Sequence, residues 1–231
     1  SPASAQQKQE SRAGLDASIE DRINWRHVPL ILLLGLGGHA SKNALAPAEP
    51  ALHALGLSSL AYAFVASTPV LGAVVMPTVW GAWFVKHEKH VLILVPLGVL
   101  LGQLILTIGL MLNARGFRLE AGPFLIVGLV LFSLSRAGLG VVQHSTLAQA
   151  LPLGLTSGFV GVVAFTHLTK AACQWAVPRI IDDEGLIGVQ FALLLPCAMS
   201  VCAGYLLACG RPGMPHFLGG CLDVRSQRPP S

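Results

Sequence analysis

The chain of 231 residues is 53% hydrophobic and only 11% charged, and its formal net charge is +4. This balance excludes an ordinary soluble domain, which needs more charged surface. The basic residues form no patch interleaved with aromatic side chains, so nucleic-acid binding is not indicated either. The composition therefore indicates a membrane protein.

Six long apolar segments occur in the sequence, and each reaches the roughly 20 residues that a helix needs to cross a hydrocarbon core of about 30 Å. They span residues 28–46, 57–85, 91–112, 122–144, 153–177 and 186–209. The pattern predicts an all-α fold, a polytopic membrane bundle of six transmembrane helices forming one domain over residues 28–209. Residues 1–27 and 210–231 are expected to be flexible cytoplasmic tails, and the first of them lacks the apolar stretch of a signal peptide.

The loop charges predict the orientation of these helices. With both termini in the cytoplasm, nine loop Lys and Arg residues lie on the cytoplasmic side, and only Arg115, Arg118 and Arg179 lie on the other. The positive-inside rule favours this arrangement.

Polar residues recur at helical spacing in three of the segments, and no Asp or Glu occurs in any of the six. The first segment carries His39, Lys42 and Asn43, the fourth Arg136, Gln143 and His144, and the fifth His167, Lys170 and Gln174. Spacings of three, four or seven residues place most of each set on one helix face. Because a cation in hydrocarbon is costly, such residues usually face a bundle interior or a wet cavity. The first, fourth and fifth helices are expected to border a cavity for an anionic solute, joined by the second.

Structural roles are the alternative for several of these side chains. A membrane His or Gln often hydrogen-bonds across a helix interface, and Lys42 can extend toward the membrane surface from the end of its segment. Arg136 and Lys170 favour a functional role, because neither has an acid in an adjacent segment. The third and sixth segments contain no Lys, Arg or His and are expected to be outer, lipid-facing helices.

Nothing in the sequence indicates catalysis. The five cysteines show no metal-ligand spacing, so neither a metal nor another cofactor is expected. No nucleophile–base pair or acid pair stands out in the segments, so the chain is not expected to be an enzyme.

The turn after the second segment carries a recognisable motif. Gly81, Lys86 and Lys89 are similar to positions of the pattern G-x-x-x-D-R-x-G-R-K, which occupies the turn between helices 2 and 3 in the major facilitator superfamily. Val85 replaces the acid of that pattern, and Glu88 replaces its second glycine. The resemblance implies a loop that governs gating.

The fourth segment extends the resemblance, because Arg136 followed by Gly140 is similar to the family's R-x-x-x-G. Within the family, the chain most resembles the lysosomal dipeptide transporter-like branch, through Asn43 and residues 101–103 and 136–149. Lys170 falls about where that branch has a basic residue. Two further positions, Lys42 and His144, stand where the branch tends to carry acids, which favours a plain anion over a dipeptide.

The resemblance implies a secondary active transporter, a symporter of a small organic anion or peptide. It also favours the endolysosomal membrane as the location. The expected substrate-binding residues are Arg136, Lys170, Gln143, Gln174, Asn43 and Lys42. The expected proton-coupling residues are His144, His167 and His39.

Six helices make only one half of such a transporter, so the expected partners are the solute, the bilayer and a second six-helix half. That half would come from the same chain if this is a fragment, or from a homodimer. The alternative function is a non-transporting membrane subunit, or a degenerate remnant, that packs against a partner.

Overall fold

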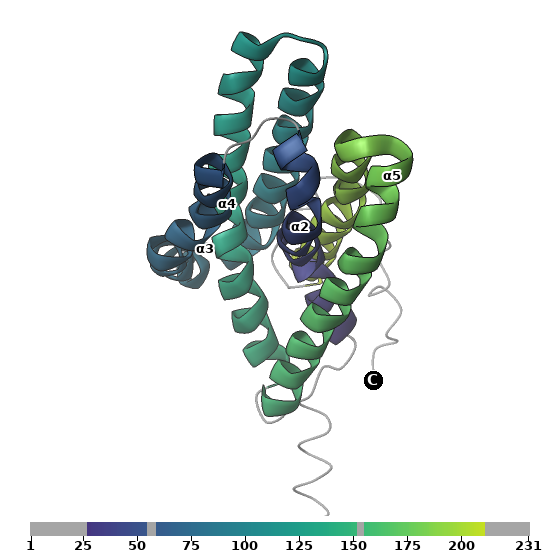
Figure 1. The fold of residues 1–231 in the computed structure, drawn as a ribbon. Coiled ribbons are helices and arrows are strands. Elements are labelled where there is room, and N and C mark those ends of the chain that lie inside the picture. Colours follow the sequence, from purple (N-terminus) through teal and green to yellow (C-terminus); the bar gives the residue numbers. More distant parts are fainter. Residues whose placement is uncertain (1–26, 55–58, 152–154, 211–231) are drawn as a thin grey trace, which may run out of the picture.

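The computed structural model describes residues 27–54, 59–151 and 155–210, so the expected tails lie outside the described residues apart from His27 and Gly210. The described chain is all-α, as predicted (Figure 1). Its helices are α2 (Val28–Ala54), α3 (Ser59–Ala114), α4 (Arg118–Ala150) and α5 (Leu155–Cys209). The prediction of six separate helices is wrong for this structure, since four are found over the described residues.

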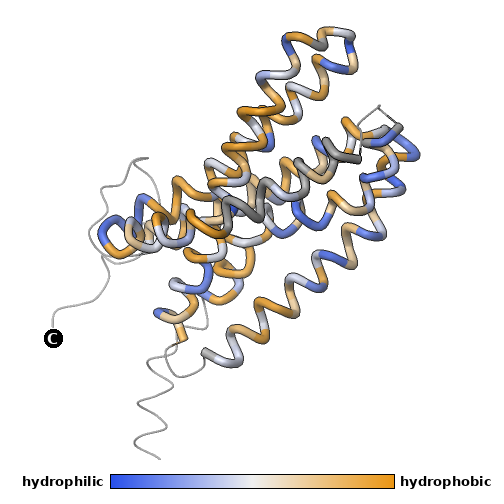
Figure 2. The backbone as a smooth tube through the Cα atoms, turned by 60° about the vertical axis from the view of Figure 1, so that its left-hand side comes forward, coloured by the Kyte–Doolittle hydropathy of each residue, from blue (hydrophilic) through white to orange (hydrophobic). Residues whose placement is uncertain are grey.

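Three stretches are long and apolar enough to cross a membrane, namely Val74–Ala114, Leu119–Ala150 and Thr156–Cys209. They indicate an integral membrane protein, as the composition does. The helix α2, which carries Lys42 and Glu49, is not among these three. Figure 2 shows hydrophobic residues along most of the hairpin that α3 and α4 form at the top of the molecule, with hydrophilic residues at its turn.

The helix α3 is folded back on itself. Its 56 residues would extend about 84 Å as a straight helix, far more than one membrane crossing. The backbone leaves the helical region only at His87 (φ −136°, ψ 46°). On either side of this break, Trp80 contacts Leu134 of α4 and Gly98 lies against Ser135 of α4. A straight helix would separate Trp80 from Gly98 by about 27 Å, so both halves reach the same level of α4 only because the chain reverses.

The helix α5 reverses in the same way at Gly185 (φ 70°, ψ −170°). Before the break, Cys173 Sγ lies 3.5 Å from Ala40 O of α2, and after it, Cys197 Sγ lies 3.8 Å from Ser41 Oγ. About 36 Å of straight helix would separate the two cysteines. Figure 1 shows the green first half rising to a turn near the α5 label and the yellow-green second half returning from it.

These two reversals explain why the six apolar segments form only four helices. The expected loops, residues 86–90 and 178–185, remain helical except at one residue each. Hydropathy marks where the chain is polar, but it does not mark where the backbone stops being helical.

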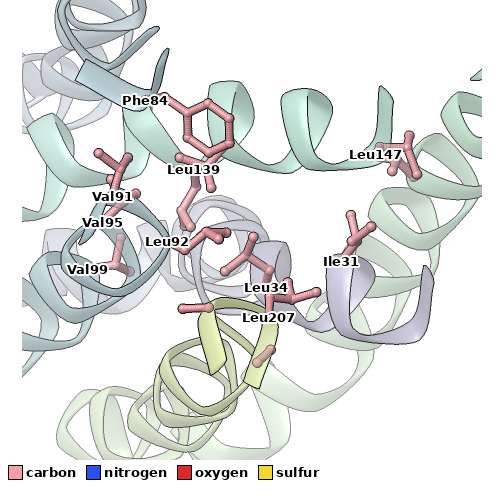
Figure 3. Close-up of a cluster of buried hydrophobic side chains, with 14 of the residues drawn as sticks. Ile31, Leu34, Phe84, Val91, Leu92, Val95, Val99, Leu139, Leu147 and Leu207 are labelled. Carbon is pink, nitrogen blue, oxygen red and sulfur yellow. The ribbon is translucent and has the colours of Figure 1, made fainter. Parts of the chain in front are cut away.

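The main hydrophobic core lies where all four helices meet. Figure 3 shows Ile31 and Leu34 of α2, Leu139 and Leu147 of α4, and Leu207 of α5 in this core. The second half of α3 adds four fully buried side chains, Val91, Leu92, Val95 and Val99. The third segment thus buries one face and exposes only the other.

A second cluster joins α2 to both halves of α5. Ala40, Ala44 and Ala48 of α2 pack there against Cys173, Val177, Leu186, Val189 and Leu193. Repeated alanines keep one face of α2 narrow, so α5 approaches it closely. Ser200 of α5 reinforces the contact, because Gly37 N donates to its Oγ at 2.7 Å.

Candidate functional site

Glycines on α2 set the position of the polar residues on α4. A Cβ at Gly35 would lie 2.6 Å from Gln143 Nε2, and one at Gly38 would lie 2.7 Å from Leu139 Cδ1. The same position at Gly38 would lie 3.5 Å from Arg136 Cγ. The absence of side chains at these two glycines brings the backbones of α2 and α4 together and places Gln143 and Arg136 at their interface.

Gln143 is 1% exposed and links two groups of α2. Its Nε2 donates to Ile31 O at 3.0 Å, and its Oε1 lies 3.4 Å from His39 Nε2. A carbonyl oxygen only accepts, so the amide nitrogen must face Ile31 and the amide oxygen must face His39. His39 Nε2 therefore carries a proton, and the neutral imidazole has its free lone pair on Nδ1.

Cationic and titratable side chains surround His39. Arg136 and His144 from α4 and Lys42 from α2 lie close enough to act on it electrostatically. Arg136 is half-buried near the middle of its helix. Within the described residues, no carboxylate lies within salt-bridge distance of Lys42, Arg136 or His144. We call His39, Lys42, Arg136, Gln143 and His144 the α2–α4 cluster.

Asn43 lies one turn after His39 on α2. Its Nδ2 is buried and has no hydrogen-bond partner among the described residues. A buried amide donor without a partner is unusual and calls for an explanation. An anion held by the α2–α4 cluster would supply an acceptor.

The structure also shows that α2 extends well beyond the expected end at residue 46. It continues to Ala54, so Lys42 lies near the middle of its helix and not at its end. The Lys42 side chain is exposed, and its extension toward the membrane surface stays an alternative to a binding role.

The polar stripe of α5 lies elsewhere. His167, Lys170 and Gln174 are all exposed. The buried side chains of this half of α5 are Val162, Thr169, Cys173 and Val177, and Cys173 contacts α2. No hydrogen bond or ion pair joins the exposed stripe to the α2–α4 cluster within the described chain. Three predicted site residues thus meet between α2 and α4, namely His39, Arg136 and Gln143, with the exposed Lys42 and His144 nearby. The three on α5 do not join them.

α5 does approach the cluster at one point. The His144 ring packs on the ring of Phe159, with 5.0 Å between their centroids. This contact lies in the last turns of α4 and the first turns of α5.

The residues of the turn motif lie at the reversal of α3. Lys86 and Lys89 flank the break at His87. Gly81 faces α4, where a Cβ at this glycine would lie 3.8 Å from Val141 Cγ1. They stand around a hinge in the backbone, where a gating loop is expected, but nothing in this arrangement tests that role.

Sequence reasoning missed the contribution of Trp80. Its Nε1 donates to Leu134 O at 2.9 Å, and its ring stacks on Trp83 with 5.3 Å between centroids. The ring also fills the space above Gly138, where a Cβ would lie 2.8 Å from it. The signal available in the sequence was Gly138, because a glycine between Arg136 and Gly140 leaves room for a large side chain from a neighbouring helix.

Two glutamines join helices that carry no cation. Gln103 of α3 donates through Nε2 to Gln190 Oε1 of α5. The amides of the third and sixth segments are therefore structural, because they satisfy each other across an interface. Among the described residues, no group of three or more His, Cys, Asp or Glu side chains is arranged to hold a metal ion.

Comparison with known proteins finds no matching family model, no matching curated sequence and no matching solved structure.

Proposed function

We propose that this chain is a secondary active transporter of the major facilitator type, or one half of one, and that its solute is a small organic anion. The observation that carries the proposal is the α2–α4 cluster. It brings His39 and Arg136 to an interface between helices, with the exposed Lys42 and His144 at its edge and no described carboxylate to neutralise them.

The energetics of the membrane favour an anion at this cluster. A cation near the middle of a membrane helix is costly unless it is paired or hydrated. Arg136 presents a fork of N–H donors suited to a carboxylate, and the buried Nδ2 of Asn43 adds a further donor. A bound anion would compensate both the charge and the unmet hydrogen bond. A zwitterionic peptide fits less well, because its amine would find no acid in the cluster.

The same residues support proton coupling without a carboxylate. An anion beside a neutral imidazole favours protonation of that imidazole, and by reciprocity the protonated imidazole binds the anion more tightly. His39 is the best placed for this role, since Gln143 fixes its ring and leaves Nδ1 to accept the proton. Transport would then be anion–proton symport.

A second candidate function is a non-transporting membrane subunit. The observation that favours it is the exposed polar stripe on α5, which is unsuited to lipid and so indicates a protein neighbour. The two functions differ in whether a solute crosses the membrane.

Uptake into proteoliposomes tests the proposal. The purified chain is reconstituted, and uptake of radiolabelled lactate, succinate and dialanine is measured under an inward proton gradient. We expect uptake of a carboxylate above that of empty liposomes, and a roughly tenfold or larger loss in Arg136→Gln, because a charge-assisted hydrogen bond contributes about 1.5–3 kcal/mol. Arg179→Gln is the matched control, since Arg179 stacks on Trp175 at 3.8 Å outside the cluster. Equal uptake by wild type and Arg136→Gln, or none above empty liposomes, contradicts the proposal.

A further inference from the structure

The exposed stripe of α5 places a positive charge inside one of the three stretches that are long and apolar enough to cross a membrane. Lys170 lies midway between Leu155, where α5 begins, and the break at Gly185. About 22 Å of helix extends on either side of it, farther than a lysine stem can reach. Its exposed neighbours include Leu168 and Trp175, so the surrounding surface is apolar.

The three residues of the stripe find no polar partner in the described part of the chain. His167, Lys170 and Gln174 follow one another at i, i+3 and i+7 along one face, and none has a hydrogen bond or ion pair within the described residues. The neighbouring face of this half of α5 is already occupied, because Cys173 and Val177 pack against α2, and the stripe lies beside that packed face. Lipid cannot satisfy the stripe, since hydrocarbon offers neither an acceptor nor a counter-charge.

The chemistry of the stripe selects its partner. An ammonium group donates three hydrogen bonds, and the Gln174 amide and the His167 ring can each add one. A carboxylate matches this set, because it is negative and has two acceptor oxygens.

A second copy of this chain offers no carboxylate in the middle of its long apolar stretches. Its described acids lie at turns or near helix ends, namely Glu49, Glu88, Glu120 and residues 182–184. No Asp or Glu occurs between residues 121 and 181 or between residues 50 and 87. The acids next to α5 are Asp182, Asp183 and Glu184, which lie at its turn and not at the depth of Lys170. Two copies related by a twofold axis through this face would bring one Lys170 toward the other.

We propose that the His167–Lys170–Gln174 stripe is the docking surface for a membrane-spanning segment outside residues 1–231, and that this segment carries an Asp or Glu paired with Lys170. The surface is separate from the α2–α4 cluster, so the pairing holds whether or not the chain transports an anion.

A zero-length cross-link tests the pairing in native membranes. Membranes containing the tagged full chain are treated with dicyclohexylcarbodiimide, which is soluble in lipid. The reagent activates a carboxylate, a neighbouring lysine amine displaces dicyclohexylurea, and an amide bond remains. Peptide mass spectrometry then identifies the two linked residues. We expect Lys170 linked to an Asp or Glu that lies inside an apolar run of about 20 residues.

Two variants make the outcome decisive. Lys170→Gln should abolish the cross-link, and Lys42→Gln, which removes a lysine from α2, should leave it intact. Both lysines are exposed and neither makes a described hydrogen bond or ion pair, so both variants are expected to fold. Exchanging the charges, with Lys170→Glu and lysine in place of the partner's acid, should restore co-purification that Lys170→Glu alone abolishes.

Three results would overturn the inference. These are an amide bond from Lys170 to an acid of this chain or of a second copy, the absence of any Lys170 cross-link, and modification of Lys170 in intact membranes by a water-soluble amine reagent. The last result would show that Lys170 faces water. None of these results bears on the uptake assay, so this inference and the proposed transport function can fail independently.

Discussion

Gly35 and Gln143 form the tightest side-chain fit in the α2–α4 interface. The amide of Gln143 occupies the space that any larger residue at position 35 would need, and from there it reaches Ile31 O and His39. One glycine therefore determines how close the two helices lie and how the imidazole of the cluster is oriented. A buried amide with both ends satisfied is a strong positional constraint, because displacing it leaves polar atoms unpaired.

Gly35→Ala is expected to destabilise the chain. The added methyl group would lie 2.6 Å from Gln143 Nε2, so the amide must move and lose its hydrogen bonds. We expect a loss of about 1–3 kcal/mol in the free energy of unfolding, typical of an overpacked core. Thermal unfolding in detergent measures it.

Gly140→Ala is the matched control on the facing helix. A Cβ at Gly140 has nothing within 4 Å, so the substitution should be neutral or stabilising by up to about 1 kcal/mol through helix propensity. A melting temperature that falls equally in both variants would contradict the close contact at Gly35.

The reversals of α3 and α5 determine how the two halves of each helix are arranged. Each converts an apolar stretch too long for one crossing into two stretches that pack on the same neighbouring helix, α4 for α3 and α2 for α5, and each depends on a single non-helical residue. At Gly185 the backbone adopts φ 70° and ψ −170°, a region open almost only to glycine. Any other residue there would strain the turn that brings Cys197 back to α2.

Gly185→Ala should therefore lower the stability of the bundle by about 1–3 kcal/mol, the usual cost of a residue held in a forbidden backbone region. Gly161→Ala is its control, because Gly161 lies in the same helix with open space around it. Thermal unfolding without added denaturant, followed by circular dichroism, compares the two variants. An unchanged melting temperature in Gly185→Ala would show that the reversal does not need glycine.

The element scale also shows what the sequence could and could not predict. Periodicity placed His39 and Asn43 on one face of α2, and it grouped Arg136 with Gln143 on α4, because spacing along a helix fixes which residues share a face. It could not predict which neighbour each face meets. On α5 the face with Thr169, Cys173 and Val177 packs against the alanines of α2, and this close packing leaves Lys170 exposed.

The number of helices was mispredicted for a related reason. Apolar length predicts how often a chain can cross a membrane, whereas continuity of a helix depends on local backbone geometry. Asp182, Asp183 and Glu184 are polar enough to indicate a loop, yet they remain helical up to Gly185. The all-α class followed from the length of the apolar segments, and the membrane character followed from composition.

At the scale of the whole molecule, α2 is the central element. It contacts α4 through Gly35 and Gly38 on one side, and it contacts α5 through Gly37 and Ala40 on the other. The polar groups are divided accordingly. The α2–α4 cluster has a core of His39, Arg136 and Gln143, buried or half-buried at a helix interface, with two exposed members at its edge, and the α5 stripe is exposed throughout. We propose two roles to match, an anion site inside and a protein contact outside.

The central claim is that water and anions reach the α2–α4 cluster, and thiol labelling at Gly140 measures this most directly. Gly140 lies one turn after Arg136 on the same face, is exposed, and has open space for a side chain. Gly140→Cys is made in a chain whose five native cysteines are replaced by alanine. The rates at which this cysteine reacts with an anionic and a cationic methanethiosulfonate reagent are then compared. Each rate is divided by the rate at which the same reagent reacts with a small thiol in solution, which removes the intrinsic difference between the reagents.

We predict that the anionic reagent reacts faster and that adding Arg136→Gln lowers this preference roughly threefold to tenfold, as expected for one nearby charge in a partly hydrated site. A thiol that reacts with neither reagent, or a preference that Arg136→Gln leaves unchanged, would contradict the account.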